Sequence, residues 1–129
     1  MTFSCKNLPN MDTFSRSDGM ALLQEKQGSV WRNLGFTEIV QDNLNPECVK
    51  CFEVPYRFEE QQFFKITVYD VDDFDNPHKL ENHDYIGNVE FTLHEVVTAK
   101  DQILVRPICE TKKDAIIEIA GEEMHVDEN

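Results

Sequence analysis

The stretch that decides the fold reads Phe64-Lys65-Ile66-Thr67-Val68-Tyr69. Apolar and polar side chains alternate along it, and a period of two is typical of a strand with one buried face. We therefore expect Phe64, Ile66 and Val68 to fill the core, with Lys65 and Thr67 facing outward. This run predicts a β-strand that forms part of a hydrophobic core.

The same alternation continues beyond the strand into Asp70 and Asp72. Both carboxylates share the parity of the core residues, so they should emerge above the core where the strand leaves the sheet. Two acids at the end of a buried strand therefore indicate a polar site at one end of the domain.

Short alternating runs separated by turn residues recur along the whole chain. This pattern favours an all-β sandwich over repeated βαβ units. A helix is expected at His94–Ala99, and Asn43-Leu44-Asn45-Pro46 is a strong turn signal. Eight antiparallel strands are expected, at Thr2–Lys6, Met20–Lys26, Leu34–Val40, Lys50–Tyr56, Phe64–Tyr69, Tyr85–Leu93, Ile103–Ile108 and Ala115–Ala120.

Length and charge limit the possible classes of protein. A chain of 129 residues fits one domain, which we expect over residues 1–121, followed by an acidic tail or the start of an inter-domain linker over residues 122–129. A net charge of −13 disfavours nucleic acid and also repels an anionic bilayer, so membrane binding would need a cation. Without a signal for export or insertion, and with four scattered cysteines, we expect free thiols and a cytoplasmic protein.

Aspartates concentrate in two segments that are far apart in sequence. Asp12 and Asp18 bracket the first, and the second holds Asp70, Asp72, Asp73, Asp75 and Asp84. In an antiparallel sandwich, loops that leave the strands at the same end meet in space. If these two loops meet, their carboxylates converge, although aspartates also commonly serve polar turns.

Converging carboxylates destabilise one another unless a cation is bound. Ca²⁺ suits irregular loops because it accepts 6–8 oxygen ligands in flexible geometry, whereas Mg²⁺ requires a tighter octahedron. About two Ca²⁺ ions would nearly balance five aspartates and leave coordination positions open for lipid phosphate or carboxylate oxygens. The pattern thus predicts a calcium site that lipid completes.

Each aspartate-rich loop also carries an aromatic residue, Phe14 in the first and Phe74 in the second. Inserting an exposed ring into a bilayer would contribute about 1.5–3 kcal/mol. We therefore interpret both as membrane-contacting residues. The alternative is that either ring folds back onto its own loop.

Other metal and redox patterns fit less well. Residues 70–81 place acids as in an EF-hand loop, but Phe74 stands at a ligand position and Asp75 replaces the turn glycine. Cys48 and Cys51 form a C-x-x-C pair that we interpret as structural, because strand residues three apart face opposite sides. The histidines His78, His83, His94 and His125 are dispersed and are expected at the surface.

The chain resembles the first C2 domain of the copine family over nearly its whole length. The matching segments are Cys5-Lys6-Asn7-Leu8, Asp12 to Asp18, Thr37-Glu38-Ile39-Val40, Asn43-Leu44-Asn45-Pro46, Phe58-Glu59-Glu60, Val68-Tyr69-Asp70-Val71-Asp72 and His83-Asp84-Tyr85-Ile86-Gly87. The resemblance implies an eight-stranded Greek-key sandwich in the type II strand permutation. It also implies that the calcium ligands are Asp12, Asp18, Asp70, Asp72 and Asp84, with Asp75 as a further candidate because loop residues 72–84 must fold back.

The resemblance further implies a function and its setting. Copines bind acidic phospholipids such as phosphatidylserine and move from cytoplasm to the plasma membrane or other membranes on a Ca²⁺ rise. The chain would then be one module of a longer copine-like protein, or an unusually short relative, monomeric by itself, with protein partners acting through the parent protein. Two rivals remain: a Ca²⁺-independent protein-interaction C2 module, and a metal-dependent hydrolase, for which no nucleophile or general base is recognised.

Overall fold

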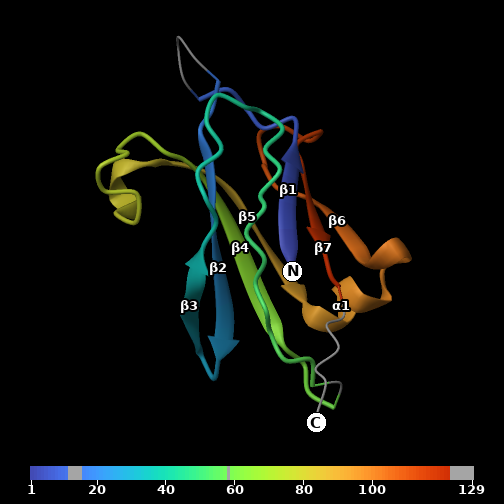
Figure 1. Cartoon of the computed structure of the whole chain (residues 1–129). Helices are drawn as coiled ribbons and strands as arrows, with labels where there is room; N and C mark the ends of the chain where they lie inside the picture. Colours follow the sequence, from blue (N-terminus) through green and yellow to red (C-terminus); the bar gives the residue numbers. More distant parts are fainter. Residues whose placement is uncertain (12–15, 58, 123–129) are drawn as a thin grey trace.

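The computed structural model describes residues 1–11, 16–57 and 59–122. Figure 1 shows strands as the dominant elements, with short helical turns between them. In chain order the elements are β1 (Thr2–Lys6), β2 (Gly19–Gln27), β3 (Val30–Phe36), β4 (Phe63–Asp70), η1 (Leu80–Asn82), β5 (Asp84–Thr92), α1 (Leu93–Thr98), η2 (Lys100–Gln102), β6 (Ile103–Pro107) and β7 (Ile116–Ala120).

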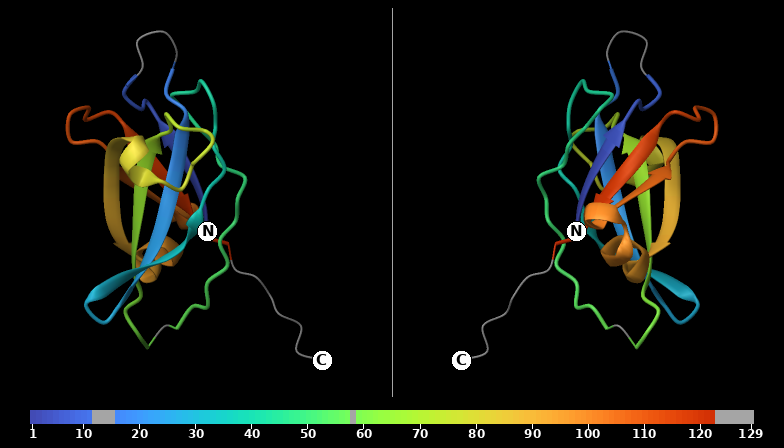
Figure 2. Two further views of the ribbon diagram at one scale, coloured as in Figure 1. Left: turned by 90° about the vertical axis from the view of Figure 1, so that its left-hand side faces the viewer. Right: turned by 90° about the vertical axis from the view of Figure 1, so that its right-hand side faces the viewer.

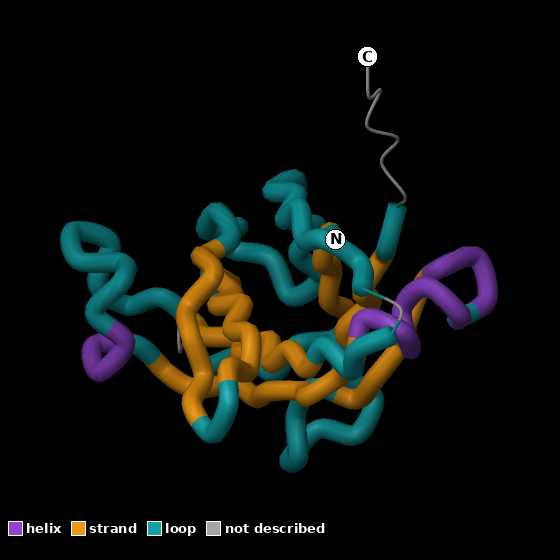
Figure 3. The backbone as a smooth tube through the Cα atoms, turned by 90° about the horizontal axis from the view of Figure 1, so that it is seen from below, coloured by secondary structure: helices purple, strands orange, loops and turns teal. Residues whose placement is uncertain are grey.

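The strands form two antiparallel sheets that face each other. One sheet has the order β1-β7-β6 and the other β3-β2-β4-β5. Viewed along the strands in Figure 3, the sheets lie at the centre and the helical turns lie at the periphery. The predicted β-sandwich is confirmed, while the type II permutation stays a prediction.

The core lies between the sheets and contains the predicted face of β4. Phe64, Ile66 and Val68 are all buried, and the Phe64 ring stacks on Phe91 of β5 with centroids 5.7 Å apart. Thr67 is buried as well, contrary to the expectation that it faces solvent. Its side of the sheet also holds buried Leu22, its partner on β2, so β4 is covered on both faces at this point.

Two predicted strands differ from the structure. Leu34–Val40 was expected, but the strand is Val30–Phe36, because Gly28 adopts a positive φ of 64° and closes a tight hairpin with β2. Lys50–Tyr56 forms no strand, so the described residues contain seven strands.

The segment that contains Lys50–Tyr56 runs beside β1 instead, and Figure 2 shows it descending one side of the sandwich. Cys48 N–H donates to the Phe3 carbonyl, and Phe52 N–H donates to the Met1 carbonyl. Between these bonds β1 advances by two residues and the segment by four, so a regular ladder cannot form.

The helix α1 starts one residue before the predicted His94. Thr92 and Glu95 form a capping box, in which the Thr92 Oγ1 accepts from the Glu95 N–H at 3.2 Å and Glu95 Oε1 accepts from the Thr92 N–H at 3.0 Å. β7 ends at Ala120, and the proposed tail lies almost entirely outside the described residues. The domain boundary therefore stays a prediction.

The connections that matter for function lie at one end of the sandwich, opposite the β2–β3 turn (Figure 2). They are loop 1 (residues 7–18, of which 7–11 and 16–18 are described), loop 2 (residues 37–46), loop 3 (residues 71–83) and the β6–β7 connection (residues 108–115). Backbone hydrogen bonds join loops 1 and 2: Leu8 N–H donates to Leu44 O, and Asn43 N–H donates to Ser17 O. Loops 1 and 2 are therefore bonded to each other at this end of the sandwich.

Candidate metal centre

Loops 1 and 3 meet, although they are far apart in sequence. Gly19 pairs with Asp70 in the sheet, so the chain enters β2 beside the point where it leaves β4. The Val71 N–H then donates to the Asp18 carbonyl at 2.9 Å. The predicted meeting of the two aspartate-rich loops is confirmed.

Asp70 is the last residue of β4 and is completely buried. Its Oδ1 accepts a hydrogen bond of 2.8 Å from the Asp18 N–H, so the side chain fastens loop 1 to loop 3. Burial disfavours the charged form of a carboxyl unless hydrogen bonds or a cation compensate. Asp70 therefore lies at the buried base of the site and is bonded to loop 1.

Asp84 stands directly opposite Asp70, because the two residues are the last pair of the β4–β5 ladder. Asp72, two residues further along, brings a third carboxylate to the same place. One carboxylate oxygen from each of Asp70, Asp72 and Asp84 lies within 4.8 Å of the others. Three oxygens at this spacing could surround one hard cation.

Asp18 lies beside this group and contacts loop 2. Its Oδ1 accepts from the Asp42 N–H at 2.7 Å, and Asp42 Oδ1 in turn accepts from the Arg16 N–H at 2.8 Å. Ser17 Oγ donates to the Pro9 carbonyl at 2.8 Å and so draws together the two sides of loop 1. Asp18 is thus positioned by three loops at the edge of the cluster.

The other predicted ligands are placed differently. Asp12 and Phe14 lie outside the described residues. Asp75 is exposed, and its N–H donates to Asp73 Oδ1 at 3.2 Å. Within the described part of the chain, the group of three close acids does not include Asp75.

Asp73 has a structural role that the sequence reasoning did not assign. Its Oδ2 accepts from the side-chain amides of Asn76 and Asn82 at 3.1 and 2.7 Å, and its Oδ1 from the N–H groups of Asp75 and Asn76. The amides of Asn76 and Asn82 are the main reason that the pKa of Asp73 lies below its usual value. The sequence signal for this role is that Asn76 follows Asp73 by three residues in a segment rich in turn-forming residues.

Two histidines of loop 3 also make specific contacts, whereas only surface positions were expected. The His78 ring stacks on Phe36 of β3 at a centroid distance of 4.0 Å and an interplanar angle of 6°. His83 Nδ1 accepts from the Asp72 N–H at 3.2 Å, and its Nε2 lies 2.8 Å from the Pro77 carbonyl. Loop 3 is therefore ordered by side chains that are not acids of the cluster.

Exposed apolar side chains lie on the segments that carry the acids. Phe74 is 46% exposed, Tyr85 54% and Met11 42%. Phe74 has therefore not folded back completely onto its own loop. Neither Tyr85 nor Met11 was predicted as a membrane-contacting residue, although each stands next to a predicted ligand in the sequence.

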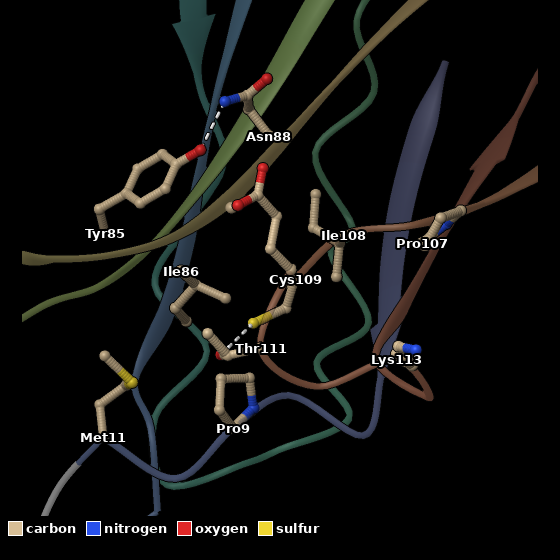
Figure 4. A pocket seen from close by; sticks show the side chains of 12 residues that line it. Pro9, Met11, Tyr85, Ile86, Asn88, Pro107, Ile108, Cys109, Thr111 and Lys113 are labelled. Carbon is tan, nitrogen blue, oxygen red and sulfur yellow. Dashed lines mark hydrogen bonds between the residues drawn. The ribbon is translucent and has the colours of Figure 1, made fainter.

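A groove of about 980 Å³ opens beside the cluster between β5 and the β6–β7 connection (Figure 4). Ile86 and Ile108 form part of its apolar lining, together with Met11 and Tyr85, which stand next to Asp12 and Asp84 in the sequence. The two sheets approach closely at Gly87, where an added Cβ would lie 1.6 Å from the Ile108 carbonyl oxygen. This glycine therefore permits direct backbone contact at the groove.

Cys109 faces the groove, and its Sγ lies 3.3 Å from Thr111 Oγ1 (Figure 4). Burial raises the pKa of this thiol, but hydrogen bonds from Thr111 and from the Lys112 N–H outweigh burial and leave it below its usual value. The groove lining contains no histidine among the described residues.

A family model described as the C2 domain matches residues 1–107. Among curated relatives, nicotinic receptor-associated protein 1 of Caenorhabditis elegans is 34% identical over 115 residues, covering 76% of this chain and 18% of that protein. Copine-E of Dictyostelium discoideum is 33% identical over 132 residues, covering 96% of this chain and 22% of that protein. The chain therefore spans about a fifth of the length of these relatives.

A solved C2 domain of plant extended synaptotagmin 1 has the same fold, with a TM-score of 0.62 and 18% identity. The match covers 91% of this chain and 88% of that one. No helix in the described residues is long and apolar enough to span a membrane. From the two facing sheets, the acids gathered at one end and the matches over most of its length, the chain belongs to the C2 domain family, with copines among its relatives.

Proposed function

We propose that this domain binds Ca²⁺ through its loop aspartates and that the bound ions attach it to acidic phospholipid membranes such as those containing phosphatidylserine. The observation that carries this proposal is the group of Asp70, Asp72 and Asp84, whose oxygens lie within 4.8 Å of one another at an end with exposed apolar side chains. Membership of the C2 family and the copine relatives support it.

The proposed ligand set extends beyond this group. Asp70, Asp72 and Asp84 supply the central oxygens, Asp18 and Asp12 complete the set from loop 1, and Asp75 is a further candidate on loop 3. Such a set suits about two Ca²⁺ ions, because each ion requires 6–8 oxygens and water or lipid can supply the remainder. Mg²⁺ fits less well, since it requires a near-ideal octahedron.

Charge explains why the membrane attachment would depend on Ca²⁺. The chain carries a net charge of −13 and would be repelled by an anionic bilayer. Bound ions would nearly neutralise the carboxylates at the loop end and offer coordination positions to lipid oxygens. Phe74 and Phe14 would then insert among the lipids, where burying the exposed half of one ring contributes about 1 kcal/mol.

The wider setting of the domain belongs to the same proposal. We infer that it is the first C2 module of a copine-like protein and that it acts as a binding module rather than an enzyme. It would be monomeric by itself and would not bind nucleic acid. The parent protein would be cytoplasmic, would move to membranes when Ca²⁺ rises and would supply any protein partners.

Sedimentation with phosphatidylserine vesicles tests the proposal directly. The wild-type domain should sediment in Ca²⁺ and remain in the supernatant in chelator. Asp72→Asn and Asp84→Asn each remove one carboxylate from an exposed position, and each should weaken Ca²⁺ binding by about tenfold or more in calorimetry. Glu81→Gln, an exposed loop 3 change outside the close group, is the matched control and should behave as the wild type.

A second candidate function is a Ca²⁺-independent protein-interaction module. It is favoured by the name of one relative, nicotinic receptor-associated protein 1, which refers to association with a receptor. Equal sedimentation in chelator and Ca²⁺, together with no calorimetric Ca²⁺ signal, would refute the first proposal and favour this one.

A further inference from the structure

We infer that His83 is a positioning residue whose imidazole holds Asp72 in the metal cluster. This inference rests on the proposed Ca²⁺ function of the same loop. It concerns a side chain that is not itself a ligand and that would act before any ion is bound.

The three close aspartates are fixed in different ways. Asp70 and Asp84 form the last pair of the β4–β5 ladder, and the sheet itself sets their separation. Asp72 lies two residues beyond that pair, at the start of loop 3, where the register of the sheet no longer determines its position. Asp72 is therefore held by contacts outside the ladder, one of which is the bond from the preceding Val71 N–H to the Asp18 carbonyl.

The imidazole of His83 supplies such a contact. Its Nδ1 accepts from the Asp72 N–H at 3.2 Å and from the Asp73 N–H at 3.5 Å. Because His83 immediately precedes Asp84, these bonds join the two ends of loop 3 at the point where the chain re-enters the sheet. They bring the backbone of Asp72 next to the residue that precedes its partner ligand.

The other ring nitrogen fixes the orientation of the imidazole. Nε2 lies 2.8 Å from the Pro77 carbonyl, which can only accept, so Nε2 carries the proton and Nδ1 is free to accept the two N–H groups. One ring at the end of loop 3 thus contacts the start of the loop, at Asp72 and Asp73, and its middle, at Pro77. The Asp73 side chain adds hydrogen bonds to Asn76 and Asn82 of the same loop.

The consequence is that loop 3 is shaped before the ion arrives. Ordering a loop on binding reduces the observed affinity, and a loop already held in its bound arrangement avoids that loss. Without the His83 contacts, Asp72 should sample positions away from Asp70 and Asp84, and the affinity for Ca²⁺ should fall.

The test measures the Ca²⁺ dissociation constant of the whole chain by calorimetry for three proteins. His83→Leu removes both ring nitrogens and should weaken binding about tenfold. His83→Asn places an amide oxygen near the Nδ1 position and should recover most of that loss. His94→Leu is the control, because His94 lies on α1 outside the loop end, and it should leave the affinity unchanged.

A double-mutant cycle separates positioning from general stability. His83→Leu should lose most of its effect when Asp72 is already Asn, because the positioned carboxylate is gone. In an Asp84→Asn background its effect should remain nearly complete, since the ladder places Asp84. Equal effects in both backgrounds, or Ca²⁺ affinity of His83→Leu within twofold of the wild type, would overturn the inference.

Two further outcomes are distinguishable. If His83→Asn binds as weakly as His83→Leu, the acceptor at Nδ1 is not the cause and the inference is wrong. If the wild type binds no Ca²⁺, the proposed function fails, and the positioning role is decided on the metal-free protein by amide hydrogen exchange at Asp72 and Asp73. Exchange there should accelerate in His83→Leu, and unchanged exchange overturns the inference.

Discussion

Gly87→Ala should severely destabilise the domain by separating the two sheets. An added Cβ would lie 1.6 Å from the Ile108 carbonyl oxygen and 2.8 Å from its carbon. Ordinary carbon–oxygen contact requires about 3.3 Å, so β5 and the β6–β7 connection must move apart by more than about 1.5 Å. Adding a methyl group to a packed core commonly costs about 1–3 kcal/mol, and here the obstacle is backbone that cannot change rotamer. We expect a loss of about 3 kcal/mol or more.

Urea denaturation monitored by the fluorescence of Trp31 measures this loss. Gly19→Ala is the matched control, because its Cβ would meet its nearest neighbour, Pro46 Cγ, at an ordinary 3.4 Å and should shift stability by less than about 0.5 kcal/mol. If Gly87→Ala costs less than about 1 kcal/mol with an unchanged denaturant slope, the close approach of the sheets is not as described.

The remaining predictions concern the N-terminal cap of α1 and the exposed aromatic rings at the loop end. The pKa of Glu95 lies below its usual value, mainly because the Thr92 N–H donates to the carboxylate and also because Arg106 bonds to it. The charged carboxylate therefore stabilises the fold at pH values above its unfolded pKa, about 4.3. This stabilisation is lost as the pH falls through the lower folded pKa. Glu95→Gln should therefore destabilise the domain at pH 7, and its difference from the wild type in denaturant midpoint should shrink toward pH 3. Phe74→Ala and Tyr85→Ala should reduce Ca²⁺-dependent vesicle sedimentation severalfold while calorimetric Ca²⁺ affinity without lipid stays within twofold; a lost affinity would instead make these rings part of the ion site.

Much of the sandwich could be read from local patterns. The alternation at residues 64–69 predicted β4 and its buried face, and Thr2–Lys6 was predicted with the same bounds as β1. Alternation failed at Lys50–Tyr56, because the segment that contains these residues bonds to the free edge of β1 with an unequal spacing of hydrogen bonds. Whether a strand forms there depends on its partner and not on its own side chains.

The candidate site shows the same division. The parity of β4 indicated that Asp70 and Asp72 would emerge together, and the sandwich rule indicated that Asp18 would lie close by, as the bond from its N–H to Asp70 now shows. Residues 72–84 were expected to fold back and bring Asp84 to the other acids, and Asp84 does face Asp70 across the ladder. Ligand status for Asp12 and Asp75 stays a prediction.

The sequence by itself determined the class of fold and the residue types of the site, because the alternation of side chains and the excess of aspartate are local properties. Only the tertiary structure decided which acids are neighbours, why Gly87 must lack a side chain and which histidine holds the loop. Those facts depend on distances between segments remote in the chain. Such distances are set by strand register and sheet packing, which no local pattern contains.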